Sequence, residues 1–231
     1  MSRATAKLFS WLQGADFYRL LYQEALEQLP PGDGRRFLDV GCGPGLLTRL
    51  AASRGYRAVG VDSDPDMVRT AEEQARERGS SATFRLGTVA DLRERAGSAD
   101  VVAAASLLAV LADKEAGLRS LWSSVRPGGT LLIVEPTDRL SLQEVRRLPP
   151  AALSGKRAFG LRLWAWARGG RTVRPEIYRT LDRDAASRRF VPLLQGLVGA
   201  WILERAETDS PPSHARRSAH ITSIPEESHD D

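Results

Sequence analysis

A glycine-rich stretch, LDVGCGPGLLTRL at residues 38–50, constrains the fold of this 231-residue chain more than any other segment. It joins a short apolar run to an amphipathic segment that begins at Leu46. Between them, Gly41, Gly43 and Gly45 occupy alternate positions. Glycine readily adopts backbone conformations that other residues disfavour. The stretch therefore predicts a buried strand, a tight turn and a helix, an arrangement that often holds a nucleotide cofactor.

The same alternation of strand-like and helix-like patterns continues along the chain. The expected strands are 35–40, 56–62, 82–87, 99–106 and 130–136, followed by a hairpin of 188–194 and 198–205. The expected helices are 7–29, 46–54, 65–78 and 113–126, and Asp64 before Pro65 indicates the N-cap of the third. Strands that alternate with helices at this spacing predict a parallel, doubly wound α/β sheet. The final hairpin adds antiparallel pairing at one side of the sheet.

The length suits one α/β domain, which we assign to residues 1–207. Residues 137–185 interrupt the alternation and read as an insertion with helical pieces that carries Trp164 and Trp166. These tryptophans would shape a substrate pocket or pack in the core. Residues 208–231 are polar and rich in proline and serine, so we expect a disordered tail.

The composition of the chain indicates where in the cell the protein is expected. Apolar residues make up 42% and charged residues 27% of the chain, and no apolar run approaches the roughly 20 residues that a membrane span needs. The first residues lack the pattern of a signal peptide. Cys42 is the single cysteine, so no internal disulfide can form. We therefore expect a cytoplasmic protein without a membrane span.

The net charge of +4 is spread unevenly. Arginine alternates with acidic residues through most of the chain, which indicates solvated helix faces and disfavours a nucleic-acid partner. Residues 156–189 are the exception, because basic residues outnumber acidic ones there. This Arg-rich insertion is either ordinary surface or a site for an anionic substrate.

The glycine pattern distinguishes between cofactors. A dinucleotide fingerprint, G-x-G-x-x-G counted from Gly41, would need glycine at position 46, which is Leu46. A phosphate-binding P-loop would need a Lys-Ser or Lys-Thr pair, which does not follow the glycines here. The acid at Asp39 would disfavour an anion and favour a ligand with a cationic centre.

Five segments in order, RFLDVGCGPG, VGVDSDPDMV, FRLGTVADL, ADVVAAAS and RPGGTLLIVEP, cover residues 36–135. In their content and spacing they resemble the class I S-adenosylmethionine-dependent methyltransferases. The greatest similarity is to the small-molecule group that includes the ubiquinone and menaquinone biosynthesis methyltransferases. The resemblance implies a Rossmann-like sheet of seven strands in the order 3-2-1-4-5-7-6 with the last strand antiparallel, and lid elements at about 1–30 and 137–185.

The resemblance also implies which residues hold S-adenosylmethionine. Gly41, Gly43 and the backbone at Cys42 would pass close to its methionine portion, where a Cβ would collide with the ligand. Asp39 would bind the amino group, directly or through water. Ser106, just after the fourth strand, would lie under the methionine portion.

The adenosine portion would contact residues after the second and third strands. Asp62 would accept hydrogen bonds from both ribose hydroxyls, because an ionised carboxylate is an acceptor with two oxygens. Ser63 and Met67 would flank the adenine, and Thr88 and Val89 would meet its edge. Relatives often carry an acid where this chain has Thr88, so adenine recognition would rely more on backbone groups.

No catalytic residue and no metal site can be assigned from the sequence. The three histidines, His214, His220 and His229, all lie in the expected tail, so the domain lacks an imidazole base. A carboxylate such as Glu135 or Asp138 is the remaining candidate. Otherwise, in-line placement in a dry pocket would account for the rate.

The sequence thus predicts an enzyme that transfers a methyl group from S-adenosylmethionine to a small organic acceptor, which would be anionic if the Arg-rich insertion binds it. One alternative is an RNA or protein methyltransferase that docks its substrate on this insertion. Another is a non-catalytic protein that binds S-adenosylmethionine. Neither the acceptor nor the oligomeric state follows from the sequence.

Overall fold

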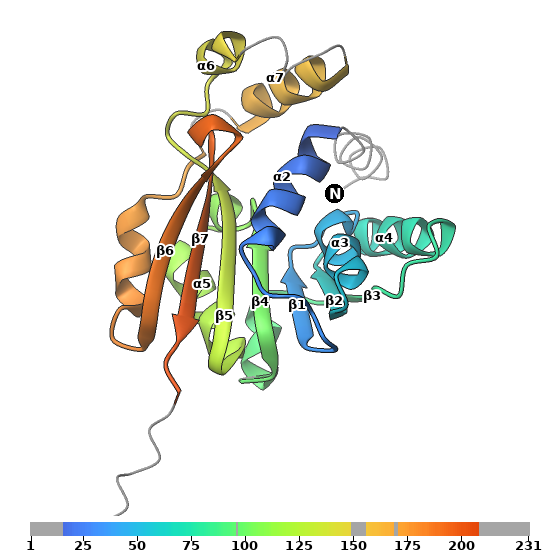
Figure 1. Ribbon diagram of the computed structural model, residues 1–231, viewed down its shortest axis with the longest axis vertical. Helices are drawn as coiled ribbons and strands as arrows, with labels where there is room; N and C mark the ends of the chain where they lie inside the picture. Colours follow the sequence, from blue (N-terminus) through green and yellow to red (C-terminus); the bar gives the residue numbers. More distant parts are fainter. Residues whose placement is uncertain (1–15, 96, 149–155, 169–170, 208–231) are drawn as a thin grey trace, which may run out of the picture.

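The computed structural model describes residues 16–95, 97–148, 156–168 and 171–207, which form a seven-stranded sheet with helices on both faces (Figure 1). The strands are β1 (Arg36–Val40), β2 (Arg57–Asp62), β3 (Thr83–Leu86), β4 (Ala99–Ala105), β5 (Val125–Pro136), β6 (Ala185–Leu193) and β7 (Val198–Arg205). Their order in the sheet is β3-β2-β1-β4-β5-β7-β6. Strand β7 runs antiparallel to β5 and β6, whereas the other neighbours are parallel. The predicted topology is confirmed.

Helices connect the strands and extend beyond them. The α-helices are α2 (Asp16–Glu27), α3 (Leu46–Ser53), α4 (Pro65–Glu77), α5 (Lys114–Ser124), α6 (Leu142–Arg147) and α7 (Lys156–Arg168). The 3-10 helices are η1 (Ala90–Arg95), η2 (Leu108–Val110), η4 (Pro175–Leu181) and η5 (Leu194–Gly196). Within the described ranges, no helix combines the length and the apolarity that a membrane crossing requires.

Two apolar cores lie on opposite faces of the sheet, as alternation along buried strands requires. One core joins α2, α3 and α7 to side chains such as Leu132 and Val134 of β5. The other joins α5 and η4 to the intervening residues, Leu131 and Ile133. The insertion therefore contributes to both faces, with α7 on one and η4 on the other.

Helix α2 buries two adjacent residues in each turn. Phe17 and Tyr18 are buried, as are Leu21 and Tyr22 one turn later. Leu20 has a similar apolar spacing, but 54% of its surface is exposed. The aromatic rings of α2 therefore lie on its inner face.

Strand β5 starts earlier than predicted. The expected helix 113–126 ends at Ser124, and the strand includes the Pro-Gly-Gly segment that was expected to precede it. The pairing with β4 shifts between Val125 and Thr130, which marks an irregularity of the ladder. A Cβ at Gly129 would lie 2.9 Å from the carbonyl oxygen of Asp100, so glycine permits this close approach.

The predicted tail at 208–231 and the first half of the predicted helix 7–29 lie outside the described residues, as do 149–155 and 169–170 in the insertion. The division of the chain into a domain at 1–207 and a tail therefore stays a prediction. The helical pieces expected at 137–185 are present as α6, α7 and η4.

Gly45 sets how closely α3 approaches the sheet. It is the N-cap of α3, with φ of 78° in the left-handed region. A Cβ at this position would overlap the ring of Phe84 on β3 and lie 3.0 Å from the Cβ of Ala71 on α4. Gly45 thus permits the close packing that a third glycine at position 46 would give in a dinucleotide-binding loop.

We expect Gly45→Ala to lower the free energy of unfolding by about 2–4 kcal/mol, because left-handed strain and overpacking add. Gly79→Ala is the matched control, since Gly79 also has positive φ (60°) but a Cβ there meets nothing within 4 Å. The control should lose only about 1 kcal/mol. Urea denaturation measures both losses, and equal losses would contradict the packing role of Gly45.

Candidate functional site

The loops after β1, β2 and β4 open on the same edge of the sheet, because these strands are parallel and their ends are in register. Val40 pairs with both Val61 and Ala104. In open α/β sheets, ligands bind at this carboxyl edge. The residues predicted after these strands therefore lie along one edge of the sheet.

The glycine loop is fastened to the end of β2 by backbone hydrogen bonds. The N–H groups of Gly41 and Cys42 donate to the carbonyl oxygen of Val61 at 2.8 and 3.1 Å. Gly41 and Gly43 have φ of 71° and 52°. These left-handed conformations explain why glycine occupies both positions.

Gly41 also faces a neighbouring loop of the protein. We expected a Cβ at this position to collide with the ligand. In the structure it would lie 2.9 Å from Cδ1 of Leu107, which follows β4. Glycine at 41 therefore suits both the left-handed backbone and the packing between two loops, and the predicted approach of the cofactor to Gly41 stays a prediction.

Asp62 links the two loops that the sequence assigns to the cofactor. Its Oδ2 accepts the N–H of Gly43 at 2.8 Å, and its Oδ1 accepts the N–H of Asp64 at 2.9 Å. An ionised carboxylate has about four acceptor positions, so each oxygen can accept a further donor. The side chain is half-buried at the end of β2. It is therefore held in place and still able to bind two hydroxyl groups.

Asp39 is a buried acid behind the glycine loop. Only 1% of its surface is exposed, and its Oδ2 accepts the hydroxyl of Thr48 on α3 at 2.6 Å. Burial raises the pKa of Asp39 to about 7; the Thr48 hydrogen bond lowers it, and the charge of Asp62 raises it further. A cationic group bound at this edge would favour the ionised form of Asp39.

Cys42 packs in the loop and has no nucleophilic character. It is buried, and its Sγ lies 3.6 Å from the carbonyl oxygen of Gly43. Burial, followed by the charges of Asp39 and Asp62, raises the pKa of the Cys42 thiol well above its usual value. The thiol is therefore protonated at neutral pH, as expected of a cysteine that packs in a loop.

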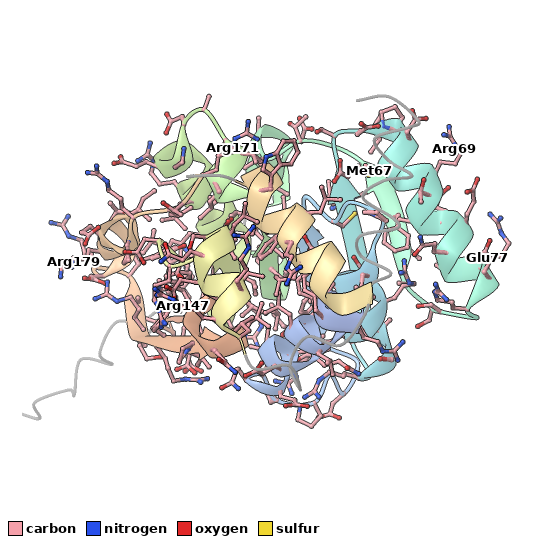
Figure 2. The ribbon with its side chains drawn as sticks, turned by 90° about the horizontal axis from the view of Figure 1, so that it is seen from above. Met67, Arg69, Glu77, Arg147, Arg171 and Arg179 are labelled. Carbon is pink, nitrogen blue, oxygen red and sulfur yellow. The ribbon has the colours of Figure 1, made fainter. Side chains whose placement is uncertain are left out.

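The residues predicted to flank the adenine lie at the start of α4. Asp64 is the N-cap and accepts the N–H of Asp66 at 2.8 Å, as the Asp-Pro pair indicates. Ser63, just before it, is exposed, and Met67 in the first turn is buried. Figure 2 shows Met67 on the inner side of α4, whereas Arg69 projects toward solvent.

Thr88 and Asp91 form a turn after β3. The N–H and the hydroxyl of Thr88 both donate to Oδ2 of Asp91, at 2.7 and 2.9 Å. These hydrogen bonds lower the pKa of Asp91. The Thr88 side chain is therefore engaged within the loop. Val89 is half-buried and, with the first half of α5, lines a cavity of about 440 Å³.

Ser106 has a strained backbone at the end of β4. Its φ of 57° is uncommon for a residue with a side chain. Its N–H donates to the carbonyl oxygen of Val134 on β5 at 2.8 Å. Such conformations gather at functional sites, where the surrounding structure enforces them.

The two carboxylates that the sequence offered as a base lie in different surroundings. Glu135 is fully buried, and its Oε1 accepts the N–H of Leu108 at 2.7 Å, so it fixes the start of η2. Asp138 is exposed beyond the end of β5. Glu135 therefore positions the loop after β4, a role that no sequence pattern signalled.

Helices α2 and α7 meet above the edge where the loops open (Figures 1 and 2). Trp164 of α7 lies with its ring centroid 6.2 Å from Phe17 and 5.6 Å from Tyr18, both on α2. Trp164 is 2% exposed, whereas Trp166 is 70% exposed. The sequence could not separate these two tryptophans. The packing places Trp164 inside the predicted lid and Trp166 on its surface.

The Arg-rich insertion is largely surface. Arg188 pairs with Asp182. Arg179 is exposed and points away from the molecule in Figure 2. Other exposed arginines of this segment are Arg162, Arg171, Arg174 and Arg183.

Comparisons with known proteins agree with this geometry. Residues 37–129 match a family model described as a methyltransferase domain. A solved structure from Methanococcus maripaludis, described as a candidate S-adenosyl-L-methionine-dependent methyltransferase, aligns with a TM-score of 0.67 at 15% identity, covering 90% of this chain and 95% of that one. This likeness supports the fold. The chain is thus similar to methyltransferases in sequence over residues 37–129 and in fold over most of its length, as the resemblance implies.

Two curated relatives are more similar in sequence. The ubiquinone biosynthesis O-methyltransferase of Xanthomonas axonopodis pv. citri is 38% identical over 116 residues, which cover 50% of this chain and 47% of that protein. The nocamycin O-methyltransferase of Saccharothrix syringae is 36% identical over 135 residues, which cover 57% and 48%. The matched part thus spans about half the length of these relatives.

The raised pKa of Asp39 predicts how stability depends on pH. A folded-state pKa near 7, against 3.8 for the ordinary group, means that the folded protein keeps a proton that the unfolded chain releases. The contribution of Asp39 to the free energy of unfolding should therefore decrease as pH rises from about 4 to 7, and it should stay constant above about pH 7. Asp39→Asn keeps an acceptor for Thr48 and removes the charge. It should be more stable than the wild type at pH 8, by on the order of 3–4 kcal/mol.

Asp100→Asn is the control with the opposite sign. Partial burial raises the pKa of Asp100, but hydrogen bonds from Arg36 N–H and the Arg126 guanidinium outweigh it and lower the pKa. This variant should lose stability above pH 4, where the ionised carboxylate stabilises the fold. Thermal unfolding from pH 4 to 8 measures both variants. A constant difference between Asp39→Asn and the wild type would contradict the raised pKa.

Proposed function

We propose that this protein is an enzyme that binds S-adenosylmethionine at the carboxyl edge of β1, β2 and β4 and transfers its methyl group to a small organic acceptor. The observation that carries the proposal is the Asp62 carboxylate. The N–H groups of Gly43 and Asp64 fix its two oxygens, and both oxygens keep acceptor capacity. A ribose with two adjacent hydroxyls fits this arrangement.

The other residues at this edge also fit the cofactor. The Asp39 carboxylate would attract the positively charged ammonium and sulfonium groups of S-adenosylmethionine. The Gly41 and Gly43 backbone would accommodate its methionine portion. Ser106 would border that portion from β4. Ser63 and Met67 would flank the adenine, with Thr88 and Val89 at its edge. Since the Thr88 hydroxyl donates to Asp91, adenine would be recognised mainly through backbone groups.

When bound, S-adenosylmethionine supplies an electrophilic methyl group on a positively charged sulfur. The protein's own contribution would be placement and exclusion of water. Helices α2 and α7 pack on one another through buried aromatic side chains above the strand ends, which suits a lid over an apolar acceptor. Because residues 1–207 contain no histidine, the acceptor would arrive already deprotonated or lose its proton late in the transfer.

A small-molecule acceptor is supported by the two relatives, which are named as a ubiquinone biosynthesis O-methyltransferase and a nocamycin O-methyltransferase. The exposed arginines of the insertion favour an RNA or protein acceptor as the second candidate, and an anionic small acceptor would also suit them. The buried, reduced Cys42 suits the cytoplasm, which we propose as the location.

Titration calorimetry tests the cofactor site directly. Wild-type protein should bind S-adenosylhomocysteine, and Asp62→Ala should weaken binding by about 1.5–3 kcal/mol, or roughly 10- to 150-fold, because hydrogen bonds to a charged group are lost. Asp100→Ala is a matched control, since Asp100 accepts the N–H of Arg36 at 2.7 Å but lies at the start of β4. It should leave the affinity unchanged. Absence of heat with folded wild-type protein would refute the proposal.

The acceptor class can be measured with methyl-labelled S-adenosylmethionine and cell extract, separated into small-molecule, RNA and protein fractions. We expect label in the small-molecule fraction. Label in the RNA fraction, lost steeply as salt concentration rises, would instead support docking on the Arg-rich insertion.

A further inference from the structure

Arg49 on α3 is a buried cation beside the glycine loop. Only 8% of its surface is exposed. Burial, followed by the charge of Arg78, lowers the pKa of Arg49 to about 10, so the guanidinium stays charged at neutral pH. A buried charge is costly unless hydrogen bonds compensate for the lost water. The partners of this guanidinium therefore indicate what it does.

The guanidinium joins the glycine loop to helix α4. Its Nη1 donates to the carbonyl oxygen of Pro44 at 2.6 Å, and its Nη2 donates to Oε1 of Gln74 at 2.7 Å. Pro44 lies within the glycine loop, and Gln74 lies on α4. Both acceptors are neutral oxygens, and the charge of Arg49 strengthens both hydrogen bonds. Arg49 therefore connects the loop after β1 to the helix after β2.

The glycine loop is held from two sides. On one side, the N–H of Gly43 donates to Oδ2 of Asp62 at the end of β2. On the other side, Arg49 holds the carbonyl group of Pro44. Gly43 and Gly45, which flank Pro44, have positive φ of 52° and 78°. Glycine restricts the backbone less than other residues do, so contacts such as these must fix the chain around Pro44.

A guanidinium suits this arrangement better than an ammonium group. Its N–H donors form a rigid, planar fork, whereas a lysine ammonium is a point charge on a flexible chain. In Arg49 the fork points at two different elements, the glycine loop and α4. The position of Pro44 relative to α4 therefore depends on this one side chain.

We propose that Arg49 is a positioning residue for the cofactor: by holding Pro44 it fixes the neighbouring Gly43, along which the methionine portion of S-adenosylmethionine would lie. The inference rests on the proposed function and adds a residue that acts on the cofactor through the glycine loop. Asp62, which would bind the ribose, is also held by the N–H of Asp64. Loss of Arg49 should therefore weaken binding of the methionine portion more than binding of the adenosine portion.

Two ligands separate these portions. S-adenosylhomocysteine carries both, whereas 5′-methylthioadenosine keeps the adenosine and lacks the amino-acid group. Arg49→Met replaces the guanidinium with an unbranched apolar side chain. We expect its Kd for S-adenosylhomocysteine, measured by titration calorimetry, to rise about tenfold, because hydrogen bonds from a charged group are lost. Its Ki for 5′-methylthioadenosine, measured by displacement of S-adenosylhomocysteine, should stay within about twofold of wild type, as for groups that share no partner.

Arg54→Met is the matched control. Arg54 is the C-cap at the other end of α3, is half-buried, and donates to the carbonyl oxygen of Leu29. This variant therefore loses an arginine next to the same helix and leaves the contact with Pro44 intact. It should change neither affinity. Melting temperatures of both variants show that they are folded under the conditions of the titration.

Amide hydrogen exchange measures the response of the loop without a ligand. The N–H groups of Gly43 and Gly45 should exchange faster in Arg49→Met than in wild type or Arg54→Met, because the backbone around Pro44 opens more often. If Arg49→Met does not fold, Arg49→Lys takes its place in both measurements, since lysine keeps the charge and loses the fork.

The outcomes separate the inference from the function on which it rests. Equal losses of affinity for the two ligands, or an unchanged Kd for S-adenosylhomocysteine, would overturn the role of Arg49 and leave the proposed function intact. Unchanged exchange at Gly43 and Gly45 would overturn that role as well. Absence of S-adenosylhomocysteine binding in folded wild-type protein would refute the proposed function itself.

Discussion

The Asp62 carboxylate holds the candidate site together, because it connects the loop after β1 to the turn that begins α4. Each of its oxygens accepts one backbone N–H, from Gly43 and from Asp64. Charge-assisted hydrogen bonds of this kind are stronger than neutral ones, so both loops share one anchor. The same side chain keeps acceptor capacity for a ligand, and the site is therefore shaped before a ligand binds.

Asp39 is a buried acid whose ionised form destabilises the fold, whereas the Asp62 carboxylate holds two loops together. Asp39 is buried against Thr48, and its pKa near 7 means that the ionised form is disfavoured. The protein keeps this acid behind a loop where a cationic ligand would favour ionisation. Stability and cofactor binding would thus make opposite demands on Asp39, which is common where activity needs a strained or charged site.

Much of the fold could be predicted from the sequence. The order of the strands follows from alternating patterns and the family resemblance, and Asp64 before Pro65 identified the start of α4. Other features depend on contacts between distant segments. Glu135 caps η2 across 27 positions, and Leu107 is what a Cβ at Gly41 would strike. No local pattern encodes such pairs, because they arise only when neighbouring strand ends meet.

The sequence alone determined the class of fold and which loops open at the carboxyl edge, because hydrophobic periodicity and glycine spacing are local properties of the chain. Tertiary structure decided which of two tryptophans is buried, why Gly41 and Gly45 must be glycine, and that Glu135 is a structural acid. The physical reason is that burial and hydrogen-bond partnership depend on what packs against a residue. For Trp164, Phe17 and Tyr18 of a helix almost 150 residues away supply that packing.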